Sequence, residues 1–326
     1  MDNRLNNSSD FERNTPGIRY SNQDDSTVFS ATFIDAITLK SIVGYLQSTN
    51  KEGNFTFGYD SIKYTQVIEK DSDGNISSQI LNEMFIDPSW LVDYEYISEY
   101  PEYTVRIKLD KLKALLADIK GKCGVTIYKV EEDTTIFLQI SGSESGIDNQ
   151  SNIGHMQPTP FSSCDESSID VYDFPPESRP TCTISSESFS RACTSFTRID
   201  STQIDVCGYA NGFTIVAKVS AGEPGKVFRF GKVTDKELSE SVHGSDHFDN
   251  NEFGIVIVDS DDEEIGMSNP KPMVSIGKKT LKSLAKVRNL ASDQTIKFFM
   301  APGLPIKIVA SVGNYGVIRI YVRDAE

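Results

Sequence analysis

The most distinctive chemical feature of the sequence is a short basic stretch, Gly277–Leu290, in an otherwise acidic chain. The stretch contains five Lys or Arg residues and no Asp or Glu, whereas the whole chain has a net charge of -15. A helix over these residues would place its lysines along one side and Leu281, Leu284 and Val287 along the other. The pattern therefore predicts an amphipathic helix with a cationic face. An ordinary solvated surface helix has the same composition, so this stretch alone does not assign a function.

A second stretch with the same pattern lies 169 residues earlier in the chain. Residues 110–140 align without a gap on residues 279–309, so that Lys113 falls on Lys282. Both segments predict a short basic helix followed by two strands. The first helix of each half also aligns, with its basic residue in register. A match of this length in pattern and register predicts two copies of one domain.

The order of helical and strand patterns predicts an α+β chain in which each half packs two helices on antiparallel β-sheets. Residues 1–27 are rich in Asn, Asp and Ser, and we expect them to be disordered. The first domain is predicted over residues 28–141 and the second over residues 181–326. Between them, residues 142–180 are rich in Ser and Pro and predict a linker on the surface.

The predicted helices separate the charge of the chain. The predicted helices together carry 13 basic and 4 acidic residues and span residues 35–47, 108–122, 185–198 and 277–290. The rest of the chain therefore has a net charge of -24. Such an acidic exterior repels nucleic acid, whereas a basic helical face attracts it. Because no aromatic residues are interleaved with these cations, they favour the phosphate backbone of a duplex over stacking on single-stranded bases.

The composition argues against several classes of protein. No apolar run reaches the roughly 18 residues of a membrane span, and the polar N-terminus does not resemble a signal peptide. We therefore expect a soluble, intracellular protein without a membrane partner. None of the five cysteines is spaced as a CxxC pair. Their number and spacing predict reduced, mostly buried thiols. Since the motifs GxxxxGK[ST], HExxH and GxSxG are absent, we expect no enzymatic activity, metal or cofactor.

Two local patterns leave alternatives open. The acidic segment 235–264 contains the apolar run FGIVIV before DSDDEE, which predicts a buried strand with a solvated acidic turn. The same pattern could bind a small modifier protein by strand addition. His243 and His247 are four residues apart beside acidic residues, so a metal site is the alternative to two ordinary histidines. A nuclease with magnesium-dependent activity is a remote alternative for the whole chain.

Three segments of the sequence resemble DNA sliding clamps of the proliferating cell nuclear antigen (PCNA) family. They are TLKSIVGYL, SFSRACTSF with the following strand pair, and APGLPIKIVASVGNYGVIRIYV. In that family each subunit has two similar clamp domains, and three subunits close head to tail into a ring whose helices surround duplex DNA. The resemblance implies a homotrimeric processivity factor that catalyses no reaction. It also implies as partners double-stranded DNA, DNA polymerase and other proteins with short PCNA-binding peptides, and an ATP-driven clamp loader.

The resemblance also implies which side chains face the DNA. One position departs from the family, because Thr194 stands where a further Arg follows the Cys of the third helix. We expect a weaker DNA contact there. The implied DNA-binding residues are the basic residues of the four helices: Lys40, Lys113, Lys120, Arg191, Arg198, Lys278, Lys282, Lys286 and Arg288.

Two further sites follow from the resemblance. The ring would close by pairing of residues 134–141 of one subunit with residues 226–234 of the next, through Thr135, Phe137, Gln139, Val227, Arg229 and Gly231. An apolar pocket for partner peptides would be lined by Val67, Ile68, Ile169, Val171, Pro305 and Tyr321. The alternative within the same fold is a non-ring or hetero-oligomeric accessory or checkpoint subunit. We expect the protein in the nucleus, or in the replication compartment of a large DNA virus in its host cell.

Overall fold

The structure is a computed structural model, and it describes most of the two predicted domains. The described residues are 27–68, 78–117, 119, 123–131, 133–141, 152–156, 175, 178–199, 201–209, 212–219, 225–231, 255–258, 274–291 and 293–324. The predicted disordered N-terminus, most of the linker, and His243 and His247 lie outside these residues.

The first half of the chain runs from β1 to β9. Its elements are β1 (Thr27–Phe33), α1 (Ala36–Thr49), β2 (Glu52–Gly58), β3 (Ile62–Ile68), β4 (Ser78–Ile86), the 3-10 helix η1 (Pro88–Trp90), β5 (Asp93–Tyr96), β6 (Glu102–Lys108), α2 (Leu109–Leu115), β7 (Gly124–Val130), β8 (Ile136–Ser141) and β9 (Asn152–Met156).

The second half repeats this order from β10 to β18. Its elements are β10 (Cys182–Ser185), α3 (Ser186–Thr197), β11 (Ser201–Tyr209), β12 (Gly212–Val219), β13 (Gly225–Gly231), β14 (Ile255–Val258), β15 (Val274–Ser275), α5 (Lys278–Leu284), the 3-10 helix η3 (Ala285–Asn289), β16 (Thr295–Phe299), β17 (Ile306–Val312) and β18 (Gly316–Asp324).

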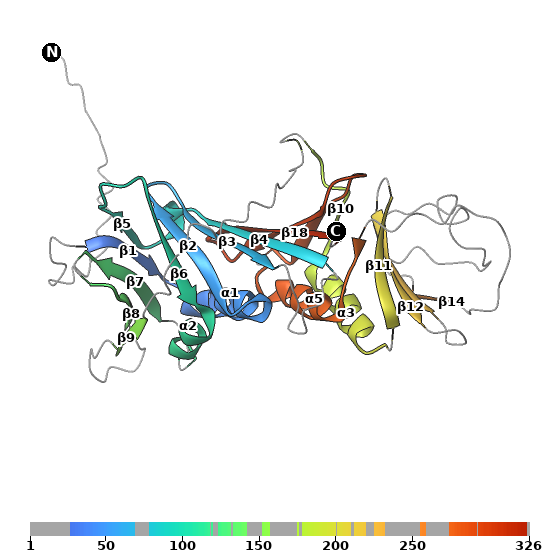
Figure 1. Cartoon of the computed structure of the whole chain (residues 1–326), viewed down its shortest axis with the longest axis horizontal. Coiled ribbons are helices and arrows are strands. Elements are labelled where there is room, and N and C mark those ends of the chain that lie inside the picture. The colour runs from blue at the N-terminus through green and yellow to red at the C-terminus, as the bar shows by residue number, and fades with distance from the viewer. Residues whose placement is uncertain are drawn as a thin grey trace, which may run out of the picture.

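The described strands form three antiparallel sheets, and the largest of them joins the two halves. It has the order β10-β16-β17-β18-β4-β3-β2-β6, with β18 of the second half paired to β4 of the first half. The two outer sheets have the orders β5-β1-β7-β8-β9 and β14-β13-β12-β11-β15. In Figure 1 the sheets extend along the whole molecule, and the helices lie together on one side of them.

Helix α1 forms where the sequence gives both a side-chain cap and an apolar stripe, whereas α2, α3 and α5 have no side-chain cap hydrogen bond. At α1, Asp35 Oδ1 accepts hydrogen bonds from the backbone N–H groups of Ile37 and Thr38 at 3.0 and 3.1 Å, which satisfies two donors of the first turn. The buried residues of this helix include Leu39 and Ile42, on the face toward the sheet. No helix in the described part of the chain is long and apolar enough to span a membrane.

The four cysteines that the structure describes are reduced, as the sequence predicted. All four are free thiols, and Cys123, Cys193 and Cys207 are buried. Burial raises the pKa of the half-buried Cys182 thiol to about 12, so this group is protonated at neutral pH. Cys164 lies outside the described residues.

The structure corrects the prediction for the end of the first domain. β9 lies inside the segment predicted as linker, where it pairs with β8 and continues the first sheet. The first sheet therefore extends to Met156 rather than ending at Ser141. The strand was missed because it is short, contains Gly154, and lies in a segment whose composition predicts a loop.

Candidate nucleic-acid interface

The helices of the two halves form one continuous layer across the junction. α2 packs on α1, α1 packs on α5 and η3, and α3 packs on α5 and η3. A hydrogen bond from Ser283 Oγ of α5 to the backbone oxygen of Ser48 in α1, at 3.1 Å, crosses between the halves. The helices that carry the predicted cations therefore lie together on one side of the sheets (Figure 1).

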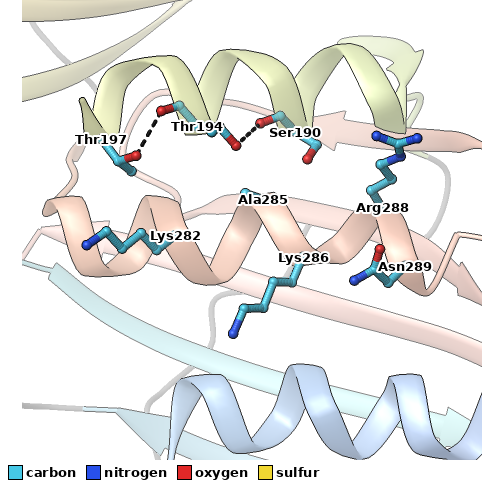
Figure 2. Close-up of a pocket in the computed structure, with 8 residues that line it drawn as sticks. All are labelled: Ser190, Thr194, Thr197, Lys282, Ala285, Lys286, Arg288 and Asn289. Carbon is cyan, nitrogen blue, oxygen red and sulfur yellow. Dashed lines mark hydrogen bonds between the residues drawn. The ribbon is translucent and has the colours of Figure 1, made fainter. Parts of the chain in front are cut away.

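The centre of this layer contains a groove of about 340 Å³ between α3 and the α5–η3 segment. Figure 2 shows the two walls of the groove, one with three small hydroxyl side chains and the other with most of the charge. We call it the α3–α5 groove. It is lined by Ser190, Thr194 and Thr197 of α3, Lys282 of α5, and Ala285, Lys286, Arg288 and Asn289 of η3.

The α3 side of the groove, which we call the hydroxyl wall, consists of Ser190, Thr194 and Thr197. Two of its hydroxyl groups donate hydrogen bonds within α3. Thr194 Oγ1 donates to the backbone oxygen of Ser190 at 2.8 Å, and Thr197 Oγ1 donates to that of Thr194 at 2.8 Å. Because these two protons are already used inside the helix, the Lys, Arg and Asn side chains of the opposite wall are the main donors available to a phosphate. Thr194 has a smaller side chain than the Arg that the family resemblance implies at this position.

Lys282 and Lys286 supply the accessible positive charge of the groove. Both are exposed, and neither forms an ion pair with the residues that the structure describes. Partial burial, followed by the nearby positive charge of Lys113, lowers the pKa of the Lys286 ammonium below its usual range. In Figure 2 the Lys286 side chain extends away from α3 toward α1. A polyanion that approached Lys286 would relieve its repulsion with Lys113.

Several of the other cations have partners within the protein. Lys40 Nζ donates to the backbone oxygen of Ala117, beyond the end of α2, at 2.6 Å. Lys113 Nζ donates to Gln47 Oε1 at 3.0 Å. Glu187 accepts from Arg191 at 2.9 Å and lies 3.7 Å from an Arg288 nitrogen. These side chains still contribute charge to the layer, but part of their hydrogen-bonding capacity is used inside the protein.

The structure brings eight of the nine predicted DNA-binding residues onto the helical layer. Lys120 lies outside the described residues. Lys278 is half-buried at the start of α5, and Arg198 is exposed at the end of α3. Sequence reasoning missed Ser190, Thr197 and Asn289 as groove residues. The spacing of Ser190, Thr194 and Thr197 along one face of α3 was the signal available for the hydroxyl wall.

Comparisons with known proteins bear on this arrangement. No family model matches the sequence, and no curated protein matches it. Among solved structures, the chain is similar to the crystal structure of proliferating cellular nuclear antigen from Entamoeba histolytica, with a TM-score of 0.62 and 17% sequence identity. The match covers 92% of this chain and 100% of that one. The chain has a PCNA-type fold.

The predicted partner pocket lies only partly within the described residues of this PCNA-type fold. Val67 of β3 and Tyr321 of β18 both stand opposite Leu81 of β4, so they share one row across the large sheet. The neighbouring Asn82 receives a hydrogen bond from Tyr45 of α1. Since successive side chains of a strand point to opposite faces, the row lies on the face away from the helices.

The described residues of this predicted pocket do not line an exposed apolar surface in the isolated chain. Tyr321 is buried, with Lys307 Nζ 5.6 Å from its ring centroid. Pro305 is half-buried immediately before β17, and Ile68 ends β3. Ile169 and Val171 lie outside the described residues. The peptide-binding role of this row remains a prediction.

Each predicted subunit edge is paired with a further strand within the chain, and its role in ring closure stays a prediction. β8, with Phe137 and Gln139 and with Thr135 just before it, lies between β7 and β9. β13, which carries Val227, Arg229 and Gly231, lies between β12 and β14. In each case a further strand pairs with the edge that was expected to be open. These residues can therefore not pair across subunits unless the covering strand moves.

Proposed function

We propose that the protein is a subunit of a sliding clamp that encircles duplex DNA and tethers a DNA polymerase and other replication or repair proteins. The observation that carries this proposal is the layer of helices, which presents Lys282, Lys286 and the neighbouring cations on one face of a strongly acidic chain. The PCNA-type fold supports it, because the same arrangement of two halves can form a segment of a ring.

The groove suggests how the protein would hold DNA. Its lysines would contact backbone phosphates, which carry no sequence information, so the contact allows movement along the duplex. The small Ser and Thr side chains opposite them would let the backbone approach closely. Such a protein needs no catalytic group. Its effect would come from converting polymerase binding into a tethered event with a high effective concentration.

Ring closure would follow the pattern of the junction inside the chain. β18 is the last strand of the second half, and it pairs with β4. β9 is the corresponding last strand of the first half, and β13 corresponds to β4. We propose that β9 of one subunit pairs with β13 of the next, and that three subunits close head to tail. Heterologous contacts of this kind form a ring when the rotation closes.

The position of β14 means that closure requires a change. β14 pairs with β13 in the isolated chain, so it must leave that edge before β9 of a neighbour can bind. We propose that an ATP-driven loader acts on the assembled ring to admit DNA, in the nucleus or in a viral replication compartment. The covered β13 edge also favours a second candidate, a clamp-like accessory or checkpoint subunit that works as a monomer or in a hetero-oligomer.

A charge-reversal variant tests the DNA contact directly. Replacing both groove lysines, Lys282→Glu and Lys286→Glu, should reduce the slope of log binding constant against log salt by about 2, because about two phosphate contacts are lost. Binding of a fluorescent duplex is measured by anisotropy over a range of salt. The matched control is Lys297→Glu, an exposed lysine on β16 whose neighbours Ile296 and Phe298 are buried on the helix side.

The control separates the groove from general charge. Lys297 points away from the helices, so its reversal should leave the salt slope nearly unchanged. Equal losses from the control and the groove variant would contradict the proposed DNA-binding face, and so would an unchanged slope in the groove variant. Circular dichroism of each variant confirms that the fold is retained.

A further inference from the structure

The exposed apolar side chains of the protein are concentrated around one strand, β5. Eight large apolar residues are exposed in the part of the chain that the structure describes, and five of them lie on or next to β5, whereas Ile34 and Ile37 lie at the start of α1 and Val317 lies on β18. Scattered apolar residues are normal on a surface, but this degree of concentration marks an interaction site. The five residues on or next to β5 are Tyr59, Trp90, Val92, Ile97 and Tyr100.

Contacts within the structure hold these residues beside β5. The backbone N–H of Val92 donates to Thr32 at 3.0 Å, and that of Ile97 donates to Val28 at 3.0 Å, so both ends of β5 are fixed to β1. The Tyr59 ring lies 4.9 Å from the ring of Tyr96. We call Trp90–Tyr100 together with Tyr59 the β5 margin. Trp90 and Tyr100, near its two ends, are 61% and 71% exposed.

β5 is also the end strand of its sheet. It pairs with β1 over four residues, and no other strand in the described part of the chain pairs with its outer edge. Tyr94 and Tyr96 are turned inward, where their hydroxyls donate to the backbone oxygens of Gly58 and Tyr100. Asp93 and Glu95 are exposed on the same strand. An end strand of this kind offers backbone groups to an added strand.

The charge of the margin restricts what can bind there. Residues 87–102 contain five acidic residues and no Lys, Arg or His. Glu102 forms an ion pair with Lys63 at 2.5 Å, while Asp93, Glu95 and Glu99 are exposed. Nucleic acid is repelled by such a surface, and two copies of this edge would repel each other. A cationic partner is attracted to it.

We propose that the β5 margin is a docking surface for a basic, extended segment of another protein. The segment adds to β5 as an antiparallel or parallel strand through its backbone. Its Lys or Arg side chains lie near Asp93 and Glu95, and its apolar side chains cover Trp90 and Val92 at one end or Ile97 and Tyr100 at the other. This site is separate from the helical layer and has the opposite charge, so it does not depend on DNA binding.

The first test uses the full-length protein and a labelled peptide that alternates Lys with Val and Phe. Two matched peptides replace Lys by Glu, or place Pro at the centre. Binding is measured by fluorescence anisotropy. We expect the Lys peptide to bind, and both the Glu and the Pro peptides to lose affinity by about tenfold or more. Equal binding of the Pro peptide would overturn strand addition, because Pro lacks the N–H that a paired strand donates.

The second test places the contact on the protein. The double variant Glu95→Lys, Glu99→Lys should weaken binding of the Lys peptide by about tenfold or more, and Trp90→Ser should also weaken it. The controls Asp110→Lys, an exposed acid on α2, and Val317→Ser should leave binding unchanged. Equal losses in the controls would overturn the proposed location.

Hydrogen exchange supplies the last criterion. Amides of residues 93–97 that face outward should exchange rapidly in the free protein and become protected when the Lys peptide binds. If they are already protected in the free protein, the edge is occupied by another segment of this chain or by a second copy, and the proposal is wrong.

Discussion

The two halves of the molecule repeat the same set of strand pairings, and they differ at β14 and at the free ends of the sheets. Among the described strands, six of the seven pairings of the first half recur in the second half. The exception is β1–β5, whose counterpart would be β10–β14. β14 instead pairs with β13. β14 therefore pairs with the edge of β13 that corresponds to the β4 edge paired with β18 in the first half.

The junction within the chain is the basis for the pairing that we propose at that edge. β18 and β4 pair along nine residues each, from Gly316 opposite Ile86 to Asp324 opposite Ser78. The guanidinium of Arg319 lies 4.7 Å from the ring centroid of Phe85, which is two residues along β4 from Glu83, the residue opposite Arg319. A long antiparallel pairing with close backbone approach therefore joins the halves, and we take it as the pattern for joining subunits.

The largest effect should follow from disrupting this internal junction. A Cβ added at Gly316 would lie 1.9 Å from the backbone oxygen of Phe85, so Gly316→Ala must push the two strands apart. We expect it to lower the free energy of unfolding by about 3 kcal/mol. Urea denaturation measures this change.

Gly44→Ala provides the matched control for that variant. No atom lies within 4 Å of a Cβ added at this position in α1, and Ala favours a helix over Gly by about 1 kcal/mol. The control should be neutral or slightly stabilising. If Gly316→Ala is equally harmless, the junction is not the close contact described above.

A second, smaller effect should come from releasing β14 from the β13 edge, which is the counterpart of the β4 edge at the junction. Val256 and Ile257 are adjacent in β14, and one of their two N–H groups must face β13 because successive N–H groups alternate in direction. Replacing both with Pro removes that donor and should free the β13 edge. We expect a discrete oligomer to form at lower protein concentration, as measured by light scattering. An unchanged mass would show that β14 does not limit assembly.

The smallest effect concerns whether a helix lysine is hydrogen-bonded within the protein or exposed in the groove, which differs between the two halves. Lys40 of the first half is bound to carbonyl oxygens at the end of α2, whereas Lys282 of the second half is exposed in the groove. Lys40→Met should therefore reduce stability by about 1 kcal/mol with little change in DNA affinity. Lys282→Met should leave stability unchanged and reduce the salt slope of DNA binding by about 1. Identical effects of the two variants would remove this distinction.

Local patterns predicted much of this fold, because periodicity and capping are encoded within short segments. The repeat, the helices at Ala36–Thr49 and Ser186–Thr197, and the basic segment that forms α5 and η3 are all visible in the sequence. The second helix was predicted over residues 108–122 but ends at Leu115.

Long-range pairing and side-chain use were not predictable in the same way. β9 is too short, and β14 lies too far from β13 in sequence, for local patterns to identify their partners. The hydrogen bonds of Lys40 to the backbone oxygens of Ala117 and Ile119 depend on how the chain beyond α2 approaches α1 in space, so the sequence of α1 alone could not predict them. The acidic β5 margin was visible only as an aromatic-rich run until its exposure was known.

The solution mass of the protein tests the central proposal most directly. Light scattering is measured at several concentrations near physiological salt. Once β14 leaves the β13 edge and β9 of a neighbour pairs there, the mass should be three times the 36.1 kDa of the chain. A mass of one chain at every concentration, both for the natural protein and for the Val256→Pro, Ile257→Pro variant, would contradict a self-assembling ring.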